Sequence, residues 1–116
     1  MIINNITKWR VNILMNNRRL IAQEFADNIK SDSIQQIILF GSVARGDDTV
    51  DSDIDILIIT VSEKEISNRV DDEVFNIISK YHEVISAHLM STEIFNKTKH
   101  FSFLSNVLKE GVMLVG

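Results

Sequence analysis

Two short apolar runs, separated by a glycine-serine turn and an aspartate-rich loop, constrain the fold of this chain most strongly. The run Ile34–Phe40 is rich in β-branched residues and stops at Gly41, which is typical of a buried strand. The second run, residues 53–59, alternates briefly and then becomes fully apolar, as a central strand does when it enters a core. The sequence therefore predicts two strands, joined by a segment that holds most of the polar chemistry.

The turn after the first strand has the composition of a phosphate-binding site. Gly41 can adopt backbone angles closed to other residues and lets a ligand approach the main chain, and Ser42 is a favoured N-cap for a short helix over residues 43–45. A helix start presents unpaired N–H groups and a partial positive charge, which together with the Ser42 hydroxyl favour bound phosphate. Arg45 adds a cationic donor. We expect Gly41, Ser42 and Arg45 to bind a nucleotide.

Two aspartates at the start of the second strand have the spacing of a metal site. Asp53 and Asp55 point to the same side of a strand and lie roughly 6.5–7 Å apart along it. Mg²⁺ prefers oxygen ligands and is usually bound by one or two carboxylates plus substrate phosphates. Two such ions, about 4 Å apart, would stabilise the attacking and leaving oxygens of a displacement at phosphorus. Ser52 is expected to cap or orient this loop and joins the cofactor-binding set.

The string GSVARGDDTVDSDIDILI resembles the minimal nucleotidyltransferases of the DNA polymerase β superfamily, whose signature is a GS turn followed by a D-x-D strand. The order of helix, strand, turn, strand, helix and strand extends the resemblance over most of the chain. It implies an α+β fold: a small mixed sheet of about four strands with helices packed on it. Residues 1–116 are expected to form one such domain.

The resemblance also implies an activity and a partner. In that family the aspartates bind metal ions and the GS turn binds phosphate, so these roles carry over to Asp53, Asp55, Gly41 and Ser42. The implied reaction is Mg²⁺-dependent transfer of a nucleoside monophosphate, AMP from ATP, onto a hydroxyl, with release of pyrophosphate. Small members are often paired with a helical HEPN-type toxin, and some transfer AMP to a tyrosine of that partner.

The third carboxylate of the family pattern is missing from its usual strand. The family places it on the next core strand, yet the strand expected over residues 84–90 contains no acid. Glu83, at the entrance of that strand, is the nearest candidate for a third catalytic residue, and His88 or Ser86 is the alternative. The gap also favours a second hypothesis, an inactive antitoxin-like module that neutralises a partner by direct contact. A small-molecule tailoring enzyme is less favoured, because such enzymes usually carry a further helical domain.

Apolar periodicity predicts the remaining scaffold. Apolar positions at helical spacing indicate a long first helix and a second helix that covers the sheet. The expected elements are helices over residues 7–29 and 62–80, a short helix capped by Ser91 or Thr92, a helix over 103–108 that stops at Gly111, and an edge strand Val112–Val115.

Composition limits the function classes. The net charge of −4 argues against a broad nucleic-acid surface. The first helix gathers Lys8, Arg10, Arg18 and Arg19, for which a solvated face is favoured and contact with an acidic partner or RNA stays open. The chain has no cysteine, so metal binding falls to carboxylates. No run is long enough to span a membrane and no secretory signal is evident, so we expect a cytoplasmic protein.

The scattered histidines and aromatic residues give weaker signals. His82, His88 and His100 show no metal-ligand spacing, so structural roles are favoured, and only His88 is a minor candidate for contact with substrate or metal. The aromatic residues are expected in the core or facing a partner, with no stacking platform. They are Trp9, Phe25, Tyr81, Phe101 and Phe103. The residues leave open whether the domain dimerises.

Overall fold

The sheet has four strands in the order β3-β2-β1-β4, in a computed structural model that describes residues 17–116. β1 (Ile34–Phe40) is antiparallel to β2 (Ile54–Thr60) and to β4 (Val112–Val115). β2 is parallel to β3 (Ile85–Ser91). The mixed four-stranded sheet is the predicted one, with β4 at the expected edge.

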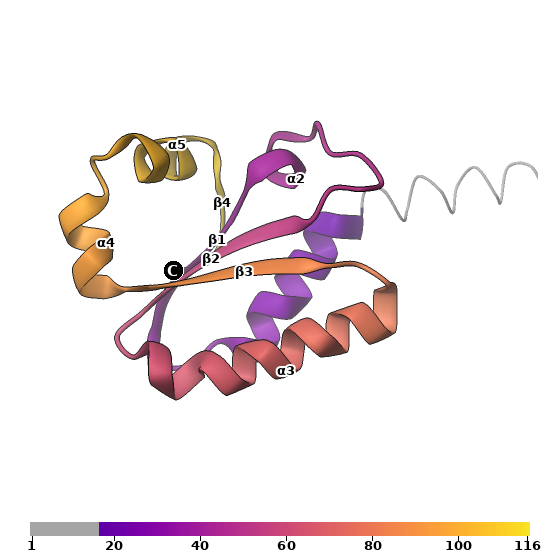
Figure 1. Cartoon of the computed structure of the whole chain (residues 1–116), viewed down its shortest axis with the longest axis horizontal. Coiled ribbons are helices and arrows are strands. Elements are labelled where there is room, and N and C mark those ends of the chain that lie inside the picture. Colours follow the sequence, from indigo (N-terminus) through magenta and orange to yellow (C-terminus); the bar gives the residue numbers. More distant parts are fainter. Residues whose placement is uncertain (1–16) are drawn as a thin grey trace, which may run out of the picture.

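Helices cover both faces of this sheet (Figure 1). A helix over residues 17–29 and α3 (Glu63–Tyr81) lie on one face, and α4 (Thr92–Thr98) and α5 (Ser102–Glu110) lie on the other. The short helix α2 (Gly41–Arg45) follows β1 directly. No helix among residues 17–116 is long and apolar enough to cross a membrane.

The central strand β2 supplies both layers of the core. Its even-numbered isoleucines, such as Ile56 and Ile58, pack with the helix 17–29 and α3, whereas Leu57 and Ile59 pack with α4 and α5. Strand side chains alternate between faces, so a nearly continuous apolar run fills two cores at once. The cluster under α4 and α5 is the smaller one, and from β2 it includes Leu57 and Ile59 but not Asp55.

The boundaries follow the predicted ones closely. β1 and β4 agree with the expected ranges, β2 and β3 each begin one residue later, and the Ser62 and Ser91 side chains cap α3 and α4. Residues 17–29 of the first predicted helix are helical, and 7–16, with Lys8, Trp9 and Arg10, lie outside the described residues.

The expected N-cap at Ser42 is wrong. α2 begins at Gly41, with Phe40 at the N-cap position and no side-chain cap, so Ser42 lies in the first turn. The strand runs straight into the helix, because Gly41 has a φ of 74° that makes the sharp turn possible without an intervening cap residue.

Candidate active site

The polar residues at the start of β2 and β3 lie on the same face of the sheet as the side chains of Leu57 and Ile59, which α4 and α5 cover. In the strand register, Asp55 lies opposite Phe40 of β1 and beside Ser86 of β3, and Leu57 lies beside His88. Paired residues project to the same face, so Phe40, Asp55, Ser86 and His88 form one surface. Asp53, two residues before Asp55, precedes β2 on this side.

The glycine-serine turn and the aspartates are in direct contact. A Cβ atom at Gly41 would overlap the Asp55 carboxylate, lying 3.2 Å from its Cγ, and Gly41 already has a left-handed φ of 74°. Only glycine lets the main chain of the turn approach this carboxylate so closely. The structure therefore brings together Gly41, Ser42, Asp53 and Asp55.

The environment of Asp55 disfavours its charged form. Burial raises the pKa of the Asp55 carboxyl, and the Asp53 charge raises this pKa further, while His88 and Arg45 act in the opposite direction. Two carboxylates aimed at one region repel each other. A bound cation would relieve this repulsion, which is the electrostatic character of a metal site.

The protein can provide only part of a metal coordination shell. Residues 17–116 contain no group of three or more acids, histidines or cysteines that could hold a metal ion. Asp53 and Asp55 could supply two carboxylates to a cation, whose remaining ligands would then be substrate oxygens and water. This division is usual for Mg²⁺, which is commonly held by one or two carboxylates plus substrate phosphates.

Glu83 is engaged elsewhere in the fold. Its carboxylate lies 3.2 Å from the Arg18 side chain, whose guanidinium also binds Asp48 at 2.9 Å. Glu83 enters β3 before Ile85, and the residue beside Asp55 is Ser86. The third position next to the aspartates thus holds a hydroxyl, with the His88 Nε2 atom 3.3 Å from the Ser86 oxygen.

The sequence pattern favoured a solvated helix face for Arg18, and this prediction is wrong: Arg18 is buried. It is only 6% exposed and donates hydrogen bonds to the carbonyl oxygens of Thr49 and Val50 as well as to its two carboxylates. The Asp48 side chain, paired with Arg18, is only 15% exposed although it lies in a loop. A buried arginine with four acceptors fixes the loop that leads into Asp53.

Neighbouring contacts hold the rest of this loop. The Arg19 guanidinium donates to the Ala44 carbonyl in α2 at 2.6 Å. The Ser52 hydroxyl accepts from the Thr49 backbone N–H at 2.9 Å, which agrees with the expected orienting role of Ser52. Arg45 lies 3.2 Å from Asp47 and 3.7 Å from Glu110. The two adjacent arginines of the first helix thus hold α2 and the aspartate loop.

An aromatic cluster borders the site, although the sequence indicated no stacking platform. The Phe40 ring lies 5.6 Å from the His88 ring and 5.8 Å, edge-on, from the Phe103 ring. Phe103 is 58% exposed and Phe101 is 66% exposed, so neither is a core residue. In the sequence, the only local feature that could have indicated this cluster is the position of Phe40 immediately before the Gly-Ser turn.

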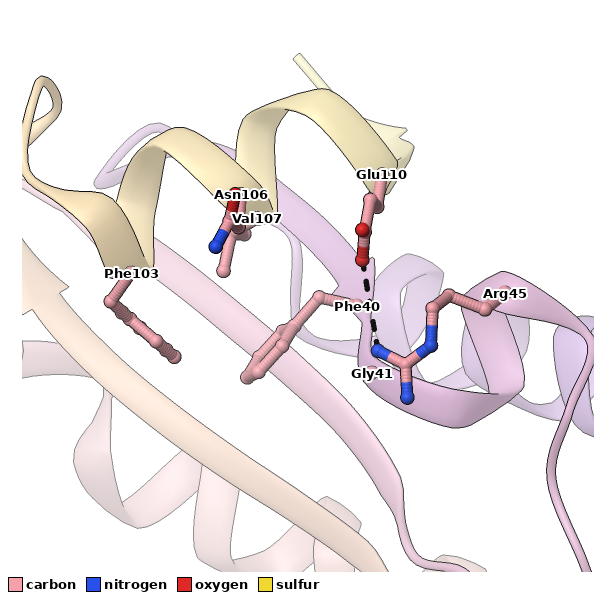
Figure 2. Close-up of a pocket in the computed structure, with 7 residues that line it drawn as sticks. All are labelled: Phe40, Gly41, Arg45, Phe103, Asn106, Val107 and Glu110. Carbon is pink, nitrogen blue, oxygen red and sulfur yellow. Dashed lines mark ion pairs between the residues drawn. The ribbon is translucent and has the colours of Figure 1, made fainter.

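A pocket opens between α2 and α5 (Figure 2). It has a volume of about 420 Å³, and Phe40, Gly41 and Arg45 line one side while residues of α5 line the other. Figure 2 shows the Phe40 and Phe103 rings turned toward each other and Glu110 reaching toward Arg45. The pocket shares Gly41 with the aspartate site.

Together, the mixed sheet and the Gly-Ser turn against two aspartates define a nucleotidyltransferase fold. The family model "Polymerase beta, Nucleotidyltransferase" matches residues 10–116. This chain belongs to the polymerase β nucleotidyltransferase family and is accordingly a transferase.

Two curated relatives come from Methanocaldococcus jannaschii. "Putative protein adenylyltransferase MJ0604" is 45% identical over 103 residues, which are 86% of this chain and 99% of the relative. "Putative protein adenylyltransferase MJ0141" is 34% identical over 95 residues, covering 79% of this chain and 93% of that protein.

Two solved structures share the fold. A toxin–antitoxin crystal structure with AMP-PNP has a TM-score of 0.51 at 21% identity, over 87% of this chain and 73% of that one. A mutant of the toxin–antitoxin MntA-HpeT has a TM-score of 0.55 at 20% identity, over 86% of this chain and 73% of that one. At such identities the likeness concerns the fold alone.

Proposed function

We propose that this chain is a Mg²⁺-dependent adenylyltransferase that moves AMP from ATP to a hydroxyl group of a protein. The observation that carries the proposal is the contact between Gly41 and the Asp55 carboxylate, with Asp53 beside it. It places a backbone turn suited to phosphate against a carboxylate pair suited to Mg²⁺. The names of the two relatives support adenylyl transfer to protein.

The reaction is a displacement at the α-phosphorus of ATP. The acceptor oxygen forms a bond to that phosphorus, the bond from the phosphorus to the oxygen bridging toward the β-phosphate breaks, and pyrophosphate leaves. Bound Mg²⁺ would supply charge stabilisation at the phosphates. Asp53 and Asp55 would hold the ion, Gly41 and Ser42 would seat phosphate oxygens, and Arg45 would add positive charge.

The acceptor proton requires a base, and His88 is better placed than Glu83. His88 projects from the same sheet face as Asp55, and its charge interacts with that carboxyl. The Glu83 carboxylate is paired with Arg18, which also donates a hydrogen bond to the loop carbonyl of Thr49. An imidazole nitrogen can accept a proton from a hydroxyl group within hydrogen-bond reach. We therefore assign proton removal to His88, with Ser86 holding its ring through the 3.3 Å contact.

Calorimetry tests the nucleotide site directly. ATP is titrated into the purified chain with and without Mg²⁺, and into the Asp53→Asn, Asp55→Asn double variant. Saturable binding should require both Mg²⁺ and the two aspartates. A double variant with the same charge change on exposed residues, Asp51→Asn with Asp72→Asn, should bind like the parent chain. Binding to the parent that survives loss of Asp53 and Asp55 would rule out this site.

A second candidate function is an inactive antitoxin-like module that neutralises a toxin by contact. The observation in its favour is the hydroxyl of Ser86 beside Asp55, where the family pattern has an acid. The two structural neighbours are toxin–antitoxin assemblies, and the family resemblance implies a HEPN-type toxin, which is therefore the partner to try first. Co-expression separates the candidates. If the Asp53→Asn, Asp55→Asn variant still neutralises the toxin, contact is the function; if neutralisation and AMP on the toxin are lost together, transfer is.

A further inference from the structure

The pocket between α2 and α5 has the chemistry of a nucleobase site. Its walls are mostly apolar: the ring of Phe40 at the end of β1, the ring of Phe103 and the side chain of Val107 on α5. A planar heteroaromatic base gains stacking and dispersion energy on such a surface. The volume of about 420 Å³ is within the range of small-ligand sites.

Phe103 is positioned to stack a planar ligand. Its ring meets Phe40 edge-on, with interplanar angle 90° and centroids 5.8 Å apart, so this contact uses an edge of one ring and leaves a face of the pair uncovered. The residue is 58% exposed although it lies on a helix with buried Leu104 and Val107. A base lying against the exposed Phe103 surface would cover apolar area that now faces solvent.

Asn106 supplies a polar group at the same wall. It lies one helical turn after Phe103 and lines the pocket with it. Within the described part of the chain, no hydrogen bond occupies its side-chain amide. A carboxamide offers a donor and an acceptor side by side, which match the N7 acceptor and N6 donor of adenine. The corresponding edge of guanine has two acceptors and would leave the Asn106 oxygen unpaired.

The pocket is continuous with the proposed phosphate site. Gly41 lines the pocket and also contacts the Asp55 carboxylate, and Arg45 lines it from α2. A nucleotide whose phosphates lie at Gly41 and the aspartates would have its base directed toward α5. The Arg45 side chain lines the same pocket and lies 3.7 Å from Glu110 of α5.

We propose that this pocket binds the adenine of the nucleotide substrate, with Phe103 stacking the base and Asn106 reading its edge. This inference rests on the proposed adenylyl transfer and adds the residues that would recognise the base. It makes α5 the element that selects ATP over other triphosphates.

Adenosine, which has neither phosphate nor need of metal, tests the pocket by itself. It is titrated into the full chain without divalent cations and followed by NMR. The Asn106 side-chain amide and the Phe103 ring signals should shift saturably, with affinity on the order of 1 mM, and guanosine should shift them less. Shifts that avoid Asn106 and Phe103, or equal shifts with guanosine, would overturn the proposal.

Variants then separate base binding from phosphate binding. With Mg²⁺ present, Phe103→Ala should weaken ATP binding about tenfold and leave binding of inorganic tripolyphosphate unchanged. Phe75→Ala removes another exposed ring, from α3 on the other face of the sheet, and should change neither. Asn106→Leu removes both hydrogen-bonding groups and should reduce the preference for ATP over GTP about tenfold, and Asn96→Leu on α4 should not.

The two proposals fail in different ways. If tripolyphosphate with Mg²⁺ does not bind while adenosine shifts Asn106, the transfer site is wrong and the base pocket stands. If tripolyphosphate binds and Phe103→Ala leaves ATP affinity unchanged, the base pocket is wrong and the transfer site stands.

Discussion

At the residue scale, the site depends on two features that a substitution can separate, backbone conformation and close contact. Gly41 and Gly46 both have left-handed φ angles, of 74° and 82°. A Cβ atom at Gly41 would meet the Asp55 carboxylate, whereas at Gly46 nothing lies within 4 Å of such an atom. The two glycines therefore have the same conformational requirement and different surroundings.

Gly41→Ala should weaken nucleotide binding, and Gly46→Ala should not. Both alanines cost about 1–2 kcal/mol of stability, because L-residues disfavour the left-handed region. Only the Gly41 variant also displaces Asp55, so ATP affinity with Mg²⁺, measured by calorimetry, should fall at least about tenfold, or 1.4 kcal/mol. Equal losses of affinity in both variants would show that strain, and not the contact with Asp55, matters.

The charge of Asp55 should make the metal-free protein less stable at neutral pH. Burial raises the folded-state pKa of this carboxyl above its unfolded value. The folded chain then binds a proton more tightly, so the stability contribution of Asp55 is full below the ordinary pKa and lost as pH rises through the raised pKa.

Asp55→Asn should therefore raise the melting temperature by a few degrees at pH 7.5 without divalent cations. At a pH below both pKa values the parent carboxyl is neutral, and the two proteins should melt alike. Thermal unfolding at the two pH values measures this difference. Asp51→Asn, an exposed loop change, is the control and should shift neither melting temperature. A variant less stable than the parent at pH 7.5 would contradict the argument.

At the element scale, the first helix orders α2 and the aspartate-rich loop through two adjacent arginines. Arg18 donates hydrogen bonds to the loop that precedes Asp53 and to Glu83, which precedes β3. Arg19 donates a hydrogen bond to a carbonyl oxygen of α2. Three segments distant in sequence are thereby held by one turn of helix. Arg18 is 6% exposed and donates four of its five N–H groups to two carboxylates and two carbonyl oxygens, so it offers little surface to an outside partner.

Arg18→Met should destabilise the fold by about 3–5 kcal/mol, because it leaves the Asp48 and Glu83 carboxylates without their buried cation. Arg18→Lys should recover only part of this loss, since an ammonium cannot serve four spread acceptors. Urea unfolding measures both. Lys97→Met removes an exposed pair with Glu93 and should change stability by less than about 1 kcal/mol. If the urea midpoint of Arg18→Met equalled that of the parent, the ion pairs of Arg18 with Asp48 and Glu83 would not stabilise the fold.

At the scale of the whole molecule, one central strand joins two helical layers. Leu57 and Ile58 are consecutive, nearly fully buried, and lie in different clusters, the first with α4 and α5 and the second with α3 and the helix 17–29. The layer that borders the active site is the thinner of the two. The sheet couples both layers, because its four strands form one continuous hydrogen-bonded sheet with β2 and β1 at its centre.

Leu57→Ala and Ile58→Ala should each cost about 2–5 kcal/mol and keep a single unfolding transition. During urea unfolding, far-ultraviolet circular dichroism follows the helices of both layers, whereas fluorescence of Tyr81 follows only the α3 layer, so the two probes should give coinciding transitions. Met113→Ala, at a residue 48% exposed on the edge strand, should cost much less. Separate transitions for Leu57→Ala would show that the α4–α5 layer unfolds independently.

The sequence by itself determined the strands, the helices and the local motifs. Alternation and helical spacing are properties of neighbouring residues, so Ile34–Phe40, the helix capped by Ser62 and the edge strand Val112–Val115 could be predicted. The Gly-Ser turn and the pair Asp53 and Asp55 were visible for the same reason. Their roles as ligands of phosphate and metal remain predictions.

Only the tertiary structure decided which residues surround that pair. Ser86 lies beside Asp55 because of the register between β2 and β3, whose partners are separated by the whole of α3. Glu83 and Arg18, likewise, meet across 65 residues, which buried an arginine that local pattern assigned to solvent. The pocket of Phe40, Phe103 and Asn106 exists because α5 returns over the end of β1. Such contacts depend on chain-wide packing, which local periodicity does not encode.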